Sequence, residues 1–226
     1  MAAAAAPHFP AGESPSASLP GTVNVSRMPV RNTHATAKGS NTVHLAVHTL
    51  DDAPADSRAV LEGIAADLGF IPNLAAVAAA SPALLAGFDG MRRAVASAKL
   101  DPVLREVAGV AVGVAVGNHY GIAFHSTVLG KLGFDESQIT ALRQGTAPAD
   151  ATVAAVSALA RQVVLDRGNL SEAVLAEAMS AGLSAEAVLD VVLECAFATL
   201  VGLIDNLAGH VELDAFLVPR AWSPGE

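Results

Sequence analysis

The sequence contains few of the residues on which several protein classes depend. Its 226 residues include one cysteine, Cys195, so the chain can form neither an intrachain disulfide nor a zinc site made of thiolates. Aromatic residues make up only 4% of the chain and charged residues 15%, whereas 52% of the residues are hydrophobic. A chain this apolar can bury a large core, which excludes general disorder.

Positive charge is also scarce. The chain has 13 lysine and arginine residues against 22 aspartate and glutamate residues, which gives a formal net charge of -9. Because no basic cluster is present, binding to a phosphate backbone is disfavoured, and we expect no nucleic-acid partner.

The first 42 residues lack both a hydrophobic period and the features of a secretory signal. They are rich in alanine, proline, serine and glycine, and no basic segment precedes a long apolar stretch. We therefore predict a disordered tail over residues 1–42, one domain over residues 43–226 and a cytoplasmic location. Residues 107–130 carry no formal charge, but several polar groups and a helix break near Gly117 favour two buried helices over a membrane span.

No alternating strand pattern with turn residues occurs, and the chain is rich in alanine, valine and leucine. Ser81 and Asp101 each precede a proline, which is typical of an N-cap followed by the first helical residue, and Gly133 is expected to end a helix. We predict an all-α fold. The expected helices cover residues 57–68, 82–98, 103–116, 118–132, 135–143, 148–166, 172–182 and 185–207.

The central segment LREVAGVAVGVAVGNHYGIAFHSTVLGKLGFDESQITALRQG resembles the carboxymuconolactone decarboxylase and alkylhydroperoxidase D-like superfamily. Three further stretches are similar to the peroxidase-related branch in the same order: LGFIPNLAAVAAASPALLAGF, RGNLSEAVLAEAMSAGLSAEAVLDVV and DNLAGHVELDAF. Together they cover most of residues 60–216. The resemblance implies an alkylhydroperoxidase D-like helical domain that forms a homo-oligomer, with dimers, trimers and hexamers all open.

The chain departs from the superfamily at its redox centre. The peroxidase branch carries Cys-x-x-Cys-x-x-x-His, and alignment on His125 places Asn118 and Gly121 at the two cysteine positions. A peroxidatic cycle needs an exposed thiolate of low pKa and a resolving thiol. Cys195 has no partner in the chain and lies in an apolar helix, where we expect a small buried side chain.

The remaining residues at this position suggest proton transfer. Asn118, Gly121 and His125 have the i, i+3, i+7 spacing of one helical face. Glu106 lies where the resemblance places the proton-relay glutamate of the superfamily. We predict His125 and Glu106 as catalytic acid/base residues and Asn118 and Gly121 as substrate-binding positions.

His119 and Tyr120, in the first turn of the same helix, complete the predicted catalytic set. Alternatives remain open for each residue: His125 and Glu106 could be a structural pair, His119 could face solvent, and Tyr120 could form only a pocket wall. Glu106, His119 and His125 also match the ligand types of open metal sites, but His119 and His125 lie about 240° apart around a regular helix. We therefore predict no metal and no cofactor.

Three classes of function fit these residues. The first is a thiol-independent acid/base enzyme, of decarboxylase, isomerase or lyase type, that acts on a small organic acid, lactone or ketone. The second is an inactive scaffold that binds a small molecule, and the third is a peroxiredoxin-type oxidoreductase that uses a route foreign to the family. The expected partners are a small-molecule substrate and further copies of the chain, without a membrane.

Overall fold

The computed structural model describes residues 45–223 and residue 225. Within this part the secondary structure is helical and no strand occurs, which confirms the all-α prediction. The predicted tail and its boundary with the domain lie outside the described residues. The helices are α1 (Ala55–Leu68), α2 (Asn73–Ala78), α3 (Pro82–Ser97), α4 (Pro102–Val116), α5 (His119–Lys131), α6 (Glu136–Arg143), α7 (Ala151–Leu165), α8 (Glu172–Ser180), α9 (Ala185–Leu207) and the 3-10 turn η2 (Val218–Arg220).

Local capping explains most of the helix boundaries. The side chain of Ser81 accepts a hydrogen bond from the backbone N–H of Leu84 at the start of α3, and that of Asp101 accepts from Val103 and Leu104 at the start of α4. Each satisfies backbone donors that would otherwise be free at a helix N-terminus. The short helix α2 and the turn η2 were not predicted.

The uncharged segment over residues 107–130 is divided as expected. Gly117 has φ +67°, a left-handed conformation that glycine adopts at low cost, and it ends α4 immediately before Asn118 caps α5. The segment therefore forms two helices that pack against each other.

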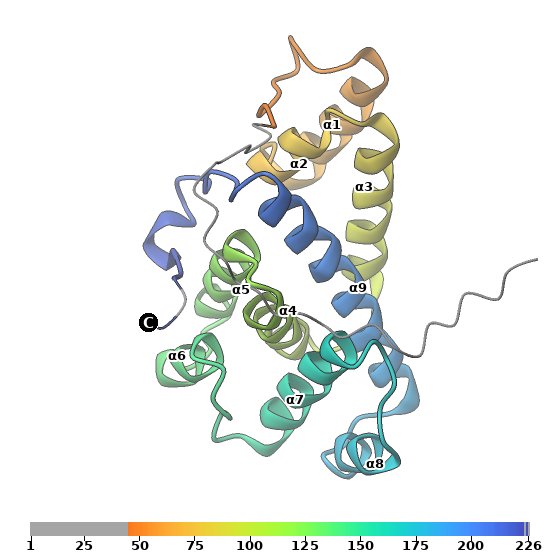
Figure 1. Cartoon of the computed structure of the whole chain (residues 1–226), viewed down its shortest axis with the longest axis vertical. Helices are drawn as coiled ribbons and strands as arrows, with labels where there is room; N and C mark the ends of the chain where they lie inside the picture. Colours follow the sequence, from red (N-terminus) through yellow and green to blue (C-terminus); the bar gives the residue numbers. More distant parts are fainter. Residues whose placement is uncertain (1–44, 224, 226) are drawn as a thin grey trace, which may run out of the picture. The chain divides into compact units, whose positions relative to one another are not determined.

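Helix α9 connects the two halves of the core. Figure 1 shows α1 to α3 at one end, α6 to α8 at the other, and α4 and α5 between them, with α9 passing alongside both groups. One buried cluster includes Val107, Leu159 and Val191, and the other includes Leu61, Leu85 and Val201. Because α9 contributes to both clusters, it fixes α4 and α5 against both ends of the domain.

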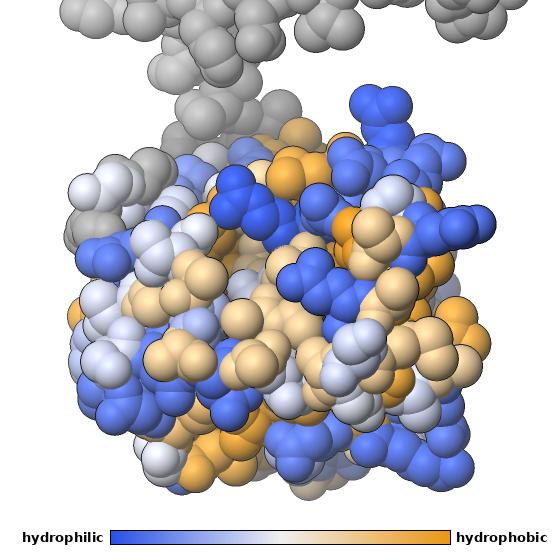
Figure 2. Space-filling model, turned by 90° about the horizontal axis from the view of Figure 1, so that it is seen from below, coloured by the Kyte–Doolittle hydropathy of each residue, from blue (hydrophilic) through white to orange (hydrophobic). Residues whose placement is uncertain are grey.

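Apolar side chains also reach the surface. By length and composition α9 could cross a membrane, a test that the core helix of a soluble protein also passes. Figure 2, which views the face at the α7 and α8 end, shows hydrophilic and apolar residues interspersed.

Candidate active site

A histidine between two carboxylates lies where α4, α5 and α9 meet. His125 Nδ1 is 2.8 Å from Glu106 Oε2, and His125 Nε2 is 3.6 Å from Glu194 Oε1. The three residues are only 8%, 4% and 1% exposed, in the order His125, Glu106, Glu194. Arg105 Nε donates a hydrogen bond of 3.1 Å to the other oxygen of Glu106. Glu106 is thus well partnered, whereas the Glu194 oxygen has no hydrogen-bond partner among the described residues.

The helix pair α4 and α5 determines this geometry. The chain reverses at Gly117, so residues 19 positions apart along the sequence come to face each other. Gly109 of α4 lies against the imidazole ring, where a Cβ atom would be only 2.4 Å from His125 Cε1. The absence of a side chain at Gly109 is therefore required for the observed position of the His125 ring.

The two carboxylates have opposite pKa shifts. Burial works to raise the pKa of Glu106, but the hydrogen bond and charge of His125, with the charge of Arg105, outweigh it and lower the pKa. Burial raises the pKa of Glu194, and the charge of His125 offsets this only in part. Burial lowers the pKa of His125, but the hydrogen bond and charge of Glu106 outweigh it and raise the pKa. Glu106 thus stays ionised at lower pH than Glu194.

A small pocket of about 80 Å³ opens beside His125. Its wall is almost entirely apolar, and three of its side chains, Phe88, Phe124 and Phe197, are phenylalanines. Of the predicted site residues, His125, Gly121 and Tyr120 line it. A pocket that combines an apolar wall with a few polar groups is the usual form of a small-molecule site.

Of the two residues predicted to bind substrate, Asn118 and Gly121, only Gly121 lines the pocket. The amide oxygen of Asn118 accepts the N–H of Gly121, its Nδ2 donates to the carbonyl of Ala198, and the residue is fully buried. A Cβ atom at position 121 would lie 2.2 Å from Asn118 Nδ2, so the Asn118 amide occupies part of the space beside the glycine. Gly121 lines the pocket, whereas Asn118 is placed as the N-cap of α5 and is not among the lining residues.

Tyr120 lines the pocket with its ring, while its hydroxyl group is already engaged. The phenolic O–H donates to the carboxylate of Asp214, which also accepts the backbone N–H of Asn73. Burial, together with the hydrogen bond to Asp214, raises the pKa of Tyr120. The phenol therefore remains protonated and directed at Asp214.

The structure does not bring His119 to this group. Its ring stacks on His210 with a centroid distance of 3.8 Å and meets the edge of Trp222 at 5.2 Å. Burial and the charge of His210 lower the pKa of His119. The set of three considered as metal ligands does not converge, since among the described residues no group of three or more His, Cys, Asp or Glu could hold a metal ion.

Cys195 is buried, as expected, with 2% exposure. Its thiol is 3.6 Å from the carbonyl oxygen of Ala160, and burial together with the charge of Glu194 raises its pKa to about 12. Such a thiol is almost wholly protonated near neutral pH, so it lacks the thiolate that attacks peroxides.

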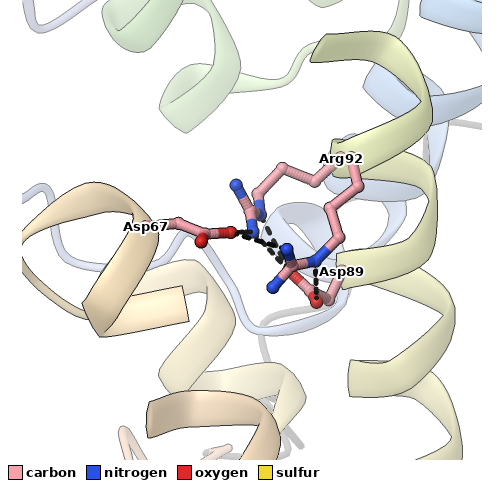
Figure 3. Close-up of polar contacts among 4 residues, drawn as sticks. Asp67, Asp89 and Arg92 are labelled. Carbon is pink, nitrogen blue, oxygen red and sulfur yellow. Dashed lines mark hydrogen bonds and ion pairs between the residues drawn. The ribbon is translucent and has the colours of Figure 1, made fainter. Parts of the chain in front are cut away.

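An ion cluster at the pocket rim was not predicted. Arg92 lines the pocket, and its Nη2 is 2.6 Å from Asp67 Oδ2 and 2.7 Å from Asp89 Oδ1 (Figure 3). Arg93 contacts the same two aspartates, with Nη1 3.0 Å from Asp67 and Nε 2.8 Å from Asp89. Glu194 was also missed, although it is the single charge in the apolar run over residues 191–204.

Comparisons with known proteins agree with this fold. Residues 82–163, which include Glu106 and His125, match the family model described as "Carboxymuconolactone decarboxylase family". No curated protein matches the sequence.

Solved structures with this fold are distant in sequence. An uncharacterized peroxidase-related protein from Ralstonia eutropha JMP134, with an alkylhydroperoxidase AhpD core, has a TM-score of 0.66 at 20% identity, covering 82% of this chain and 100% of its own. A peroxidase-related protein from Silicibacter sp. TM1040 has a TM-score of 0.63 at 19% identity, covering 80% and 96%. The debrominase Bmp8 in complex with 2,3,4-tribromopyrrole has a TM-score of 0.63 at 18% identity, covering 79% and 95%.

Proposed function

Because the chain belongs to the carboxymuconolactone decarboxylase and alkylhydroperoxidase D-like superfamily but lacks its cysteine pair, we propose that it is a thiol-independent acid/base enzyme. Its substrate is a small organic acid, lactone or ketone, and the reaction is a decarboxylation, isomerisation or lyase step. The observation that carries the proposal is the buried pair of Glu106 and His125 beside an apolar pocket.

Each member of the pair has a separate role in this mechanism. Glu106 accepts the Nδ1 proton of His125 and so fixes the ring and stabilises its imidazolium form. The opposite nitrogen, Nε2, has no hydrogen-bond partner among the described residues and transfers the proton. Tyr120, whose hydroxyl group is bound to Asp214, forms part of the substrate-facing wall. The reaction uses these side chains and no cofactor.

A catalytically inactive scaffold that binds a small molecule is the second candidate. It is favoured by the burial of His125 and its hydrogen bond to Glu106, an arrangement that a structural histidine would also adopt. A fold relative that binds tribromopyrrole supports a small ring as ligand in either case. Peroxidase activity through Cys195 is not proposed, because the thiol is buried and its pKa is about 12.

Deuterium exchange into phenylacetone in D₂O, followed by NMR, distinguishes the two candidates. Proton removal next to the carbonyl exchanges the α-hydrogens, and a positioned base typically accelerates such a step by about 10² to 10⁴-fold. We expect the chain to catalyse the exchange, His125→Asn to abolish it, and the control Cys195→Ser to retain it. Undiminished exchange in His125→Asn would refute the proposed role, whereas binding without exchange in the unaltered chain would favour the scaffold.

We further propose that the protein is a cytoplasmic homo-oligomer: a dimer, trimer or hexamer. Leu189, Val192, Leu203 and Leu207 of α9 are 40–68% exposed and have the spacing of one helical face. We call this face the α9 stripe; it extends over about 27 Å at 1.5 Å per residue. An exposed apolar face of this length is typical of a surface that a second subunit covers. The superfamily is typically soluble, which supports the location.

A further inference from the structure

The guanidinium group of Arg92 at the pocket rim pairs with two carboxylates through Nε and Nη2. It contacts Asp67 of α1 and Asp89 of α3, and Arg93 completes a cluster of two cations and two anions (Figure 3). The side chains of Arg92 and Asp89 are only 15% and 13% exposed. Burial works to raise the pKa of Asp89, but hydrogen bonds from Arg93 and Arg92 outweigh it and lower the pKa. Asp89 therefore remains charged near neutral pH, and the two arginines and two aspartates of the cluster have formal charges that sum to zero.

The other side of the pocket has no uncommitted positive charge either. His125 is the second basic residue that lines the pocket, and its charge is compensated by Glu106. Glu194 lies next to Nε2, so a carboxylate on a ligand would be placed beside existing acidic groups. The remaining lining residues are apolar apart from the Tyr120 hydroxyl, which is bound to Asp214.

Resting on the proposed function, and narrowing its substrates to ketones and lactones rather than organic acids, we propose that the pocket selects small uncharged ring compounds over the corresponding carboxylates. Asp67 and Asp89 determine this selectivity, because they neutralise the one arginine at the rim. A carboxylate that enters this apolar pocket loses its hydration without gaining a free cationic partner, which is strongly unfavourable. A ketone of the same shape loses little hydration and contacts the phenylalanine wall.

Phenylacetone and phenylacetate test this proposal, since they share a benzyl group and differ in a methyl ketone against a carboxylate. We expect NMR titrations at pH 7 to show phenylacetone binding at least about tenfold more tightly to the unaltered chain, which corresponds to about 1.4 kcal/mol. In Asp89→Asn, Arg92 is left with excess positive charge, so phenylacetate affinity should rise severalfold while phenylacetone affinity changes by less than about twofold.

A second variant and a control distinguish an effect on ligand selectivity from an effect on folding. Asp67→Asn changes a more exposed position of the same cluster and should shift the affinity ratio in the same direction. Glu136→Gln removes a carboxylate from a surface pair with Arg220 and should leave the ratio unchanged. Circular dichroism verifies that each variant retains its helices.

Three results would overturn the selectivity proposal: equal or tighter binding of phenylacetate to the unaltered chain, an unchanged ratio in both aspartate variants, or no binding of either compound. Because the readout is binding, its outcome is separate from that of the catalytic proposal. A chain that prefers phenylacetone but does not exchange its protons would retain the selectivity and reject the catalysis.

Discussion

Replacement of Glu106 by glutamine removes one negative charge beside His125, together with the acceptor for Arg105. Glutamine has nearly the same shape, and its amide oxygen can still accept the Nδ1 proton, so the hydrogen bond is retained without the carboxylate charge. We expect the pKa of His125 to fall, because the hydrogen bond to Glu106 and its charge are what raise it against the effect of burial. Histidine NMR titration measures this directly.

The same substitution should lower the free energy of unfolding. Glu106 and His125 are 4% and 8% exposed and joined over 2.8 Å, so the bond is charge-assisted in a site that water scarcely reaches. A hydrogen bond to a charged group contributes about 1.5–3 kcal/mol, roughly 1 kcal/mol more than a neutral one. Because Glu106→Gln keeps an acceptor for His125 but loses the charge and the acceptor for Arg105, we expect it to lose about 1–3 kcal/mol at pH 5.5. Urea denaturation measures the difference.

The sign of both pKa shifts fixes the pH dependence of that loss. Because the pKa of Glu106 is lowered, its contribution to the free energy of unfolding is present above pH 4.5 and is lost as the pH falls through its pKa in the folded protein. The raised pKa of His125 means that its contribution is present below pH 6.5 and is lost as the pH rises through its folded value. The destabilisation should therefore be greatest between these two ordinary values and diminish on either side.

Glu136→Gln provides a matched control for this reasoning. Glu136 also pairs with a cation, but its side chain is 64% exposed, so the substitution should change stability little and leave the His125 titration where it was. An unchanged pKa of His125 in Glu106→Gln, or a destabilisation independent of pH, would show that the pair is not the electrostatic unit described above.

Two further substitutions test packing and assembly. Gly109→Ala should lower the free energy of unfolding by about 1–3 kcal/mol, measured by calorimetry, because the added Cβ would meet the His125 ring. The control Gly90→Ala should not lower it, because a Cβ at that position would meet nothing within 4 Å. Equal stabilities of the two variants would contradict the close packing at Gly109. Light scattering should show that the chain forms a dimer or larger oligomer. Leu203→Glu, in the α9 stripe, should dissociate this oligomer, whereas Leu132→Glu, an exposed leucine outside the stripe, should not. A monomeric unaltered chain would reject the assembly.

The helices could be predicted because their signals are local. The capping residues act on neighbouring backbone groups, so the sequence alone indicates where these helices begin and end. Ser81 and Asp101, each before a proline, mark the starts of α3 and α4, and Gly117 marks the end of α4. Helix α2 was missed because it has only six residues, and its N-cap, Pro72, makes no side-chain hydrogen bond. Its five buried residues show that tertiary packing, rather than a sequence-local signal, stabilises it.

The site was predictable only where the resemblance assigned a position. His125 and Glu106 are joined as the resemblance implied, whereas the direction of His119 depends on stacking against His210, which is 91 residues away. Glu194 had a signal of its own, as a lone charge in an apolar helix, but its distance to His125 depends on how α9 packs. The pairing of Arg92 with Asp67 similarly requires α1 and α3 to be adjacent.

The loss of the cysteine pair and the neutral pocket rim are physically consistent with each other. Thiol chemistry depends on a positive environment that stabilises a thiolate, and here the arginine that lines the pocket, Arg92, is already paired with Asp67 and Asp89. Proton transfer from an uncharged substrate to Nε2 creates an imidazolium and an enolate together. Charges that form in an apolar pocket lose hydration, so this reaction depends on the ionised Glu106 beside Nδ1, which stabilises the imidazolium as it forms.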